Sequence, residues 1–384
     1  MKGLAICSKG IEDIAALEVK ELIKSDSEIK DSCIIFNVKK LEDLCLLCYK
    51  AQSVDKILLL FDFFDFQDDF IKKAGEAIKK IKLKEWMDEE NTFRVTCKKI
   101  DNEDLFSEQV SSEIGALIIE KIEKDSKYAQ KVELDKPNIT FFVFINKKTA
   151  YFGIDFSGRD LHKREYKLFA HPNSLRSTIA YSLVRISSLN EKEALLDPFS
   201  HSGEIAIEAA LFTTKFPVNY FAKEKFAFLK FSQFNGFNFD KFFKSIDKKI
   251  AKTKKPIINC FDPQLMSLNA SKKNAKIAGI NKSINFSRVD IEWLDTKLEK
   301  ESIDRVVTHP IELTKNISIK DVEKLYDQFF YQADFILKKK GNIVMIARDN
   351  GLLKKAAEKY KFKVSSEREV WSGKEVLKVV AFRQ

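Results

Sequence analysis

The eight residues Asp197-Pro198-Phe199-Ser200-His201-Ser202-Gly203-Glu204 constrain the fold of this chain more than any other stretch. The apolar residues 194–196 precede them, and residues 205–210 continue with the pattern of an amphipathic helix. The order is therefore a strand, a tight turn and a helix N-terminus. Such a unit presents backbone N–H groups at the carboxyl end of a buried strand, where α/β proteins bind cofactors.

Residues 166–384 continue with alternating strand and helix patterns, which predict a doubly wound α/β domain. We expect seven strands, at 194–196, 257–261, 284–288, 305–308, 342–346, 362–366 and 376–382. The last two are expected to form an antiparallel edge of the sheet.

The first 165 residues contain two smaller units. Residues 1–66 mix short strands (4–7, 33–36, 56–66) with helices (11–23, 41–49), which predicts an α+β sandwich of ferredoxin-like type. Residues 67–165 predict a second α+β unit. Its expected elements are a helix at 67–87 with a basic face, a strand at 92–99, a helix at 107–124, and a hairpin of 140–145 with 150–156.

Polar residues follow several of the predicted strands of the third unit. Asp262 ends one strand, Asp290 with Ile291 follows the next, and His309 with Pro310 follows residues 305–308. The carboxyl ends of parallel strands meet at one edge of a sheet, so we expect the adjacent strand ends that carry His201 and His309 to face one cleft. Asp262 could also cap the helix that follows it, and both roles can coexist.

Three motifs carry a resemblance to a known family. The loop from Asp197 to Glu204 resembles the Asp-Pro-Phe-Cys-Gly-Ser-Gly-Thr loop of S-adenosylmethionine-dependent methyltransferases that act on amino groups of nucleic-acid bases. Asn274-Ala275, followed by Gly279, resembles the Asn-Ala-x-x-Ala-Gly-Val of the same enzymes. Residues 157–166 resemble the end of a THUMP domain, where Ser-Gly-x-x-Leu-His-Lys-Arg-Gly-Tyr leads into the methyltransferase domain. Over essentially its whole length the chain is similar to THUMP-domain tRNA guanine-N2 methyltransferases.

The resemblance implies an arrangement of domains and a function. It implies a ferredoxin-like domain at 1–66, a THUMP RNA-binding domain at 67–165, and a Rossmann-like methyltransferase domain at 166–384. The expected reaction transfers a methyl group from S-adenosylmethionine to the exocyclic N2 of a guanine in tRNA. The residues that it assigns to the cofactor are Asp197, His201, Gly203, Asp262, Asp290 and Ile291.

The chain also departs from the family pattern. Ser200, His201 and Glu204 replace Cys, Gly and Thr of the loop, and the catalytic Asn-Pro-Pro-Tyr motif is replaced by His309-Pro310-Ile311-Glu312. The resemblance still assigns catalysis to His309 and Pro310, which would accept hydrogen bonds from the target amino group. Glu204 favours the helix dipole but is expected to repel the carboxylate of the cofactor.

These departures keep other hypotheses open. One is a catalytically impaired homologue that binds tRNA or serves as a partner subunit, and another is methylation of a different RNA, such as ribosomal RNA. A weaker hypothesis is that His201 and His309, with Glu204 and Glu312, form a metal site or an acid–base pair. We assign no metal. Cys45 and Cys48 form a CxxC inside a helix pattern and are interpreted as buried small hydrophobic residues.

The net charge of +10 and a pI near 9.0 suit a polyanionic partner, although a solvated lysine-rich surface would give the same values. The side chains that we predict to contact RNA phosphates are Arg94, Lys98, Lys99, Lys163 and Arg164. The lysine-rich stretch 248–255 is expected to be a loop or a solvated helix end.

No apolar run reaches the roughly 18 residues of a membrane span, and no signal peptide is recognised. We therefore expect a cytoplasmic monomer whose partner is tRNA.

Overall fold

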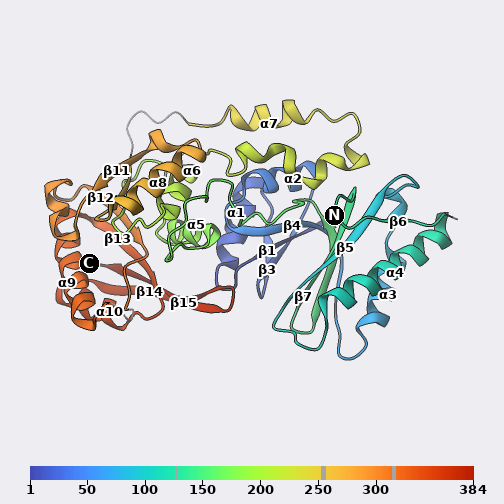
Figure 1. Cartoon of the computed structure of the whole chain (residues 1–384), viewed down its shortest axis with the longest axis horizontal. Helices are drawn as coiled ribbons and strands as arrows, with labels where there is room; N and C mark the ends of the chain where they lie inside the picture. Colours follow the sequence, from blue (N-terminus) through green and yellow to red (C-terminus); the bar gives the residue numbers. More distant parts are fainter. Residues whose placement is uncertain (127, 252–256, 314–316) are drawn as a thin grey trace.

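The computed structural model describes residues 1–126, 128–251, 257–313 and 317–384. They fold around two β-sheets, one in the front half of the chain and one in the back half (Figure 1). Part of the lysine-rich stretch 248–255 lies outside the described residues.

β4 (Val54–Asp65) is an inner strand of the eight-stranded front sheet, whose order is β2-β3-β1-β4-β8-β7-β5-β6. It is antiparallel to β1 on one side and to β8 on the other. The remaining strands are β1 (Lys2–Cys7), β2 (Ser27–Lys30), β3 (Cys33–Asn37), β5 (Thr92–Ile100), β6 (Lys131–Val132), β7 (Ile139–Asn146) and β8 (Thr149–Asp155). One continuous sheet therefore runs through both of the smaller units that the sequence indicates.

Four helices accompany this sheet: α1 (Glu12–Ile23), α2 (Leu41–Lys50), α3 (Phe70–Lys80) and α4 (Ser107–Ser126). The prediction of one helix over 67–87 is wrong in length, because α3 ends at Lys80 and only a 3₁₀ turn follows at Leu83–Glu85. Ile81 is extended, with φ −85° and ψ 136°, and the chain then buries Leu83 and Trp86 in the core.

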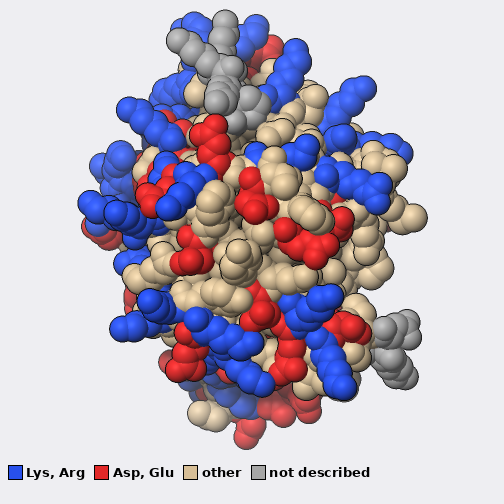
Figure 2. All heavy atoms as spheres, turned by 90° about the vertical axis from the view of Figure 1, so that its left-hand side faces the viewer, with Lys and Arg blue, Asp and Glu red and all other residues tan. Residues whose placement is uncertain are grey.

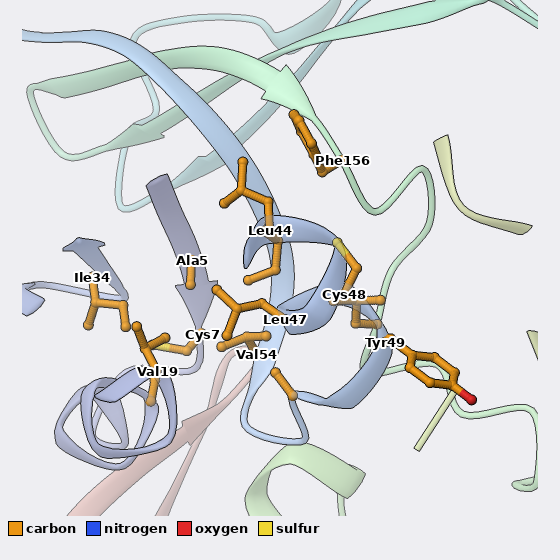
Figure 3. Close-up of a cluster of buried hydrophobic side chains, with 14 of the residues drawn as sticks. Ala5, Cys7, Val19, Ile34, Leu44, Leu47, Cys48, Tyr49, Val54 and Phe156 are labelled. Atoms are coloured by element: carbon orange, nitrogen blue, oxygen red, sulfur yellow. The ribbon is translucent and has the colours of Figure 1, made fainter. Parts of the chain in front are cut away.

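The core of the first unit lies between β1, β4 and the helices α1 and α2 (Figure 3). Cys45 and Cys48 are fully buried in it among aliphatic side chains. The interpretation of this CxxC as small hydrophobic residues is thus confirmed.

The back sheet has seven strands in the order β11-β10-β9-β12-β13-β15-β14. They are β9 (Leu195–Asp197), β10 (Ile258–Asp262), β11 (Ile284–Arg288), β12 (Ile303–Thr308), β13 (Leu337–Ala347), β14 (Lys363–Ser372) and β15 (Glu375–Arg383). The strands from β11 to β13 are parallel, whereas β15 is antiparallel to both β13 and β14. This confirms the predicted doubly wound sheet with an antiparallel edge.

Alternating residues of the central strands face opposite layers. Leu195, Cys260 and Val307 belong to one hydrophobic cluster with α5 (Ser177–Ile186) and α6 (Glu204–Thr214). The adjacent residues Leu196, Phe261 and Val306 belong to a second cluster with α9 (Ile319–Ile336) and α10 (Gly351–Lys359). The first cluster also contains the core of the front sheet, so the two halves of the molecule are packed together.

Residues 216–247 form a phenylalanine-rich strap that leaves the back domain after α6 and crosses to the front half (Figure 1). The strap contains three short 3₁₀ helices and α7 (Phe239–Asp247). Tyr49 donates its hydroxyl to Asp247 at 2.6 Å, and the Phe231 ring lies 6.0 Å from the Trp86 ring. The strap thus contacts both smaller units, and the sequence patterns did not indicate it.

Candidate functional site

The loop between β9 and α6 turns sharply at two residues with left-handed backbones. His201 has φ 50° and Gly203 has φ 86°. A Cβ atom on Gly203 would lie 2.9 Å from the Cβ of Ser271 in α8 (Leu265–Ile277), so glycine is required there for space as well as for conformation. The loop therefore passes directly over α8 and places His201 at the carboxyl edge of the sheet.

Asp262, at the end of β10, holds this loop. Its Oδ2 accepts the backbone N–H of His201 at 3.1 Å, and its Oδ1 accepts that of Gln264 at 2.8 Å. Burial raises the pKa of this carboxyl above its ordinary value, while the two N–H donors oppose the rise. Asp262 thus serves the turn that precedes α8, but it does not cap the helix as the alternative expected, because the N-cap of α8 is Gln264.

An open pocket of about 210 Å³ lies at these strand ends. Its lining residues are His171, Asn173, Phe199, His201, Asp262, Pro263, Gln264, Ser267, Ile311 and Ile317. This volume is smaller than the roughly 300–1,000 Å³ that is typical of small-molecule sites. The pocket brings together the loop after β9, the end of β10 and the segment after β12. Of the two histidines expected to face one cleft, His201 lines this pocket and His309 lies beside it.

Three of the four histidines of the chain gather beside this pocket. The His201 ring stacks on His171 with 4.8 Å between centroids, and it lies edge-on to His309 at 5.4 Å. His201 Nε2 lies 2.8 Å from the carbonyl oxygen of His309. A carbonyl can only accept, so His201 donates from Nε2. Burial, with a smaller effect of His309, lowers the pKa of His201 to about 3, so the ring is neutral.

Both ring nitrogens of His309 face oxygen atoms. Nδ1 lies 3.1 Å from the carbonyl of Asn173, and Nε2 lies 3.2 Å from Oε1 of Glu312. The other carboxylate oxygen of Glu312 accepts the backbone N–H of Arg348 at 3.1 Å. The side chain of His309 therefore ties the segment after β12 to its neighbours, and neither nitrogen points freely toward a substrate.

Other predicted residues lie around this centre. Pro310 is buried directly after His309. Asp197 is buried below the loop and accepts the Thr308 hydroxyl at 2.6 Å. Burial raises the pKa of Asp197 to about 8, partly opposed by this hydrogen bond. Asp290 is exposed at the end of β11, and the Ile291 side chain is buried in the hydrophobic core, so neither of these two lines the pocket.

No group of three or more His, Cys, Asp or Glu side chains among the described residues is arranged to hold a metal ion. The carboxylate of Glu204 is occupied by the Ser202 hydroxyl and by Lys167. The metal hypothesis for His201, His309, Glu204 and Glu312 therefore finds no support in the described residues.

The predicted RNA-contacting residues differ in exposure. The side chain of Lys163 is 72% exposed and pairs with Asp160 at 3.0 Å. Lys98 is 37% exposed and lies 3.5 Å from Asp55. Two further side chains bond to backbone carbonyls: Arg94 to that of Leu134 and Lys99 to that of Leu105.

The prediction of a phosphate contact for Arg164 is wrong. Its side chain is completely buried, and its guanidinium donates to Glu208 in α6 at 3.0 and 3.3 Å. It also donates to the carbonyls of Leu161 and Gln52. Tyr166 and Gln52 donate to the same Glu208 carboxylate, at 2.7 and 2.6 Å. This buried network joins the first unit to the helix that follows the loop. Its signal in the sequence is an acid, Glu208, within the otherwise apolar stretch 205–212 of α6.

Comparisons with known proteins agree with this architecture. Residues 164–378 match the family model described as the RMKL-like methyltransferase domain, and residues 71–155 match that of the THUMP domain. A tRNA (guanine(6)-N2)-methyltransferase of Methanocaldococcus jannaschii is 28% identical over 371 residues, which are 95% of each chain. That of Archaeoglobus fulgidus is 24% identical over 98% of this chain and 91% of its own.

Solved structures share the fold. TrmN from Thermus thermophilus superimposes with a TM-score of 0.72 at 19% identity, covering 100% of this chain and 99% of its own. SMU.472, whose crystal structure contains SAH, gives a TM-score of 0.83 at 16% identity, covering 100% and 97%. Among the described residues no helix is both long and apolar enough to cross a membrane. The methyltransferase family model spans more than half of the chain, and so the chain belongs to the RMKL-like methyltransferase-domain family, with a THUMP domain in its front half.

Proposed function

We propose that this protein transfers a methyl group from S-adenosylmethionine to the exocyclic N2 of a guanine in tRNA. The observation that carries the proposal is the pocket at the carboxyl ends of β9, β10 and β12, with the Asp262 carboxylate in its wall. Two relatives that extend over almost the whole chain are named tRNA (guanine(6)-N2)-methyltransferases, which supports the choice of tRNA and of guanine N2.

The residues of the pocket fit this cofactor. The Asp262 carboxylate already accepts hydrogen bonds from two backbone N–H groups. Its remaining lone pairs can accept hydrogen bonds from the ribose hydroxyls of the cofactor. Phe199 and Pro263 provide apolar walls, and His201 and Gly203 shape the loop end of the pocket. S-adenosylmethionine, when bound, supplies an electrophilic methyl group. Asp290, Ile291 and Asp197 remain proposed cofactor residues on the resemblance alone.

The segment after β12 is proposed to position the target base. His201 and His309 hold this segment by three hydrogen bonds, to the His309 carbonyl, the Asn173 carbonyl and Glu312. The backbone carbonyl of Pro310 is proposed to accept a hydrogen bond from the target amino group, which makes the nitrogen more nucleophilic. As the N–CH₃ bond forms and the S–CH₃ bond breaks, the nitrogen must release a proton, and the Glu312 carboxylate is proposed to accept it.

RNA is proposed to bind the front half through Lys98, Lys163, Arg94 and Lys99. The end of the molecule formed by α9 and α10 mixes cations with carboxylates (Figure 2), several of them in ion pairs such as Lys355 with Glu323. Such a mixed surface is a poorer site for a polyanion than a basic one. As a tRNA-modifying enzyme, the protein is proposed to work as a monomer in the cytoplasm.

The test has two parts. Calorimetric titration with S-adenosylmethionine should give binding that Asp262→Ala weakens strongly. Incubation with labelled cofactor and unmodified tRNA, followed by nucleoside mass spectrometry, should then give N2-methylguanosine. Cofactor binding without methylation of any tRNA would favour the impaired homologue, and labelling of ribosomal RNA instead would move the substrate to that RNA. If the protein binds no cofactor either with or without tRNA, the proposal that it is a methyltransferase is refuted.

A further inference from the structure

Glu204, the residue that departs most in charge from the family loop, has a cationic partner. It is the first residue of α6 and is only 3% exposed. Its Oε1 accepts the Ser202 hydroxyl at 2.7 Å and lies 3.3 Å from Nζ of Lys167. The Lys167 side chain is 22% exposed and also donates to the carbonyl of Leu175 at 2.5 Å. Lys167 is thus held in place by two partners from different segments.

A chain of hydroxyl groups links this pair to the pocket. The backbone N–H of His171, a lining residue, donates to Oγ of Ser174 at 2.9 Å and to Oγ of Ser202 at 3.3 Å. The two serine hydroxyls lie 2.6 Å apart. Since Ser202 donates its single proton to Glu204, Ser174 must be the donor between the two serines. The hydrogen bonds between these hydroxyl groups are thus all donated in the direction of the Glu204 carboxylate. That carboxylate in turn forms an ion pair with Lys167.

The charge of Glu204 matters because of where it lies. The N-terminus of a helix carries a partial positive charge and favours the approach of an anion. The carboxylate of a glutamate in the first turn already interacts with this partial positive charge. Unless a cation neutralises it, that carboxylate would repel a second carboxylate that approaches the same helix end. In a partly buried site such a charge is poorly screened by solvent and acts over several ångströms.

We propose that Lys167 is a positioning residue for cofactor binding: it neutralises Glu204, so that the start of α6 can still receive the carboxylate end of the cofactor. The proposal deepens the proposed function and rests on it, because it concerns S-adenosylmethionine binding at this pocket. It explains how a loop with Glu in place of Thr remains compatible with an anionic ligand group.

A double-mutant cycle tests the proposal. The four proteins are the unmodified chain, Lys167→Met, Glu204→Gln and the double variant, titrated calorimetrically with S-adenosylhomocysteine. This probe keeps the carboxylate end, lacks the sulfonium charge and is not consumed. Lys167→Met should weaken binding by roughly tenfold, which corresponds to about 1.4 kcal/mol. Glu204→Gln alone should leave affinity near that of the unmodified chain, and the double variant should recover most of the loss.

The outcomes separate this proposal from simpler roles. If Lys167→Met binds the probe normally, the compensation is refuted while the proposed function stands. If the double variant binds as weakly as Lys167→Met, then Lys167 acts directly on the ligand or on the fold, and the proposal is again refuted. Lys20→Met, which removes an exposed cation of α1 that pairs with Asp26, serves as the matched control and should bind normally. An unmodified chain that binds no probe would overturn both the proposed function and this inference.

Discussion

Replacing Arg164 with methionine should destabilise the protein far more than replacing its neighbour Lys163. Arg164 is completely buried and makes two hydrogen bonds to Glu208 and two to backbone carbonyls. Methionine fills similar space but leaves the Glu208 carboxylate without its cation. Removing one partner of a buried ion pair costs about 3–5 kcal/mol, since the remaining charge stays buried. We therefore expect the free energy of unfolding to fall by about that amount.

Lys163→Met is the control, because its ion pair with Asp160 is exposed. An exposed pair contributes about 0–1 kcal/mol. Urea unfolding at pH 7, followed by tryptophan fluorescence and by circular dichroism, measures both variants. The double variant Arg164→Met/Glu208→Gln should recover about 2 kcal/mol, because it removes the uncompensated charge and keeps one acceptor oxygen for Tyr166. A loss for Arg164→Met below about 1 kcal/mol, or a double variant no more stable than the single one, would refute this reasoning.

Four shorter predictions follow from the loop and the core. Asp197 keeps its proton up to pH 8 in the folded protein but only to about pH 3.9 when unfolded, so its contribution to stability is lost as pH rises through this window. Asp197→Asn should therefore gain unfolding free energy relative to the unmodified chain between pH 4.5 and 8, and parallel pH profiles would contradict this. Gly203→Ala should cost more than Gly373→Ala in thermal melting, since both glycines have positive φ but only Gly203 would also place its Cβ against Ser271. Purified protein should contain no stoichiometric zinc by elemental analysis, and Cys48→Ala should only open a small cavity and lower the melting midpoint by a few degrees.

The sequence predicts the strands best where an apolar run is bounded by turn residues. β9, β10, β11 and β12 lie within two residues of their predicted limits. β9, β10 and most of β12 are buried, whereas β11 is the edge strand and only its Ile284 is buried. β2 has no such run: residues 27–30 are Ser-Glu-Ile-Lys at the edge of the front sheet, and tertiary pairing with β3 makes them a strand. Residues 367–372 of β14, which include the buried Val370, were not predicted as strand, and they extend the edge of the back sheet by pairing with β15.

For the candidate site, the sequence predicts which strand ends meet but not where side chains point. The common edge of parallel strands is enough to bring His201, Asp262 and His309 together. Whether Glu204 faces the pocket or Lys167, and whether Arg164 is exposed, depends on the packing of the front units against α6. That packing joins residues more than 100 positions apart, such as Gln52 and Arg164, and no local pattern reports it.

The position of β4 has a consequence for synthesis of the chain on the ribosome. One edge of β4 can pair with β1 as soon as Asp65 has left the ribosome. The strand that pairs with its other edge, β8, begins only at Thr149. At roughly 5–20 residues per second, the intervening 84 positions take about 4–17 s to translate. During that delay a strand containing Ile57-Leu58-Leu59-Leu60-Phe61 has one unpaired edge, which is a template for pairing with other chains. Nascent chains that stop between β4 and β8 should therefore depend on chaperones more than the finished protein does.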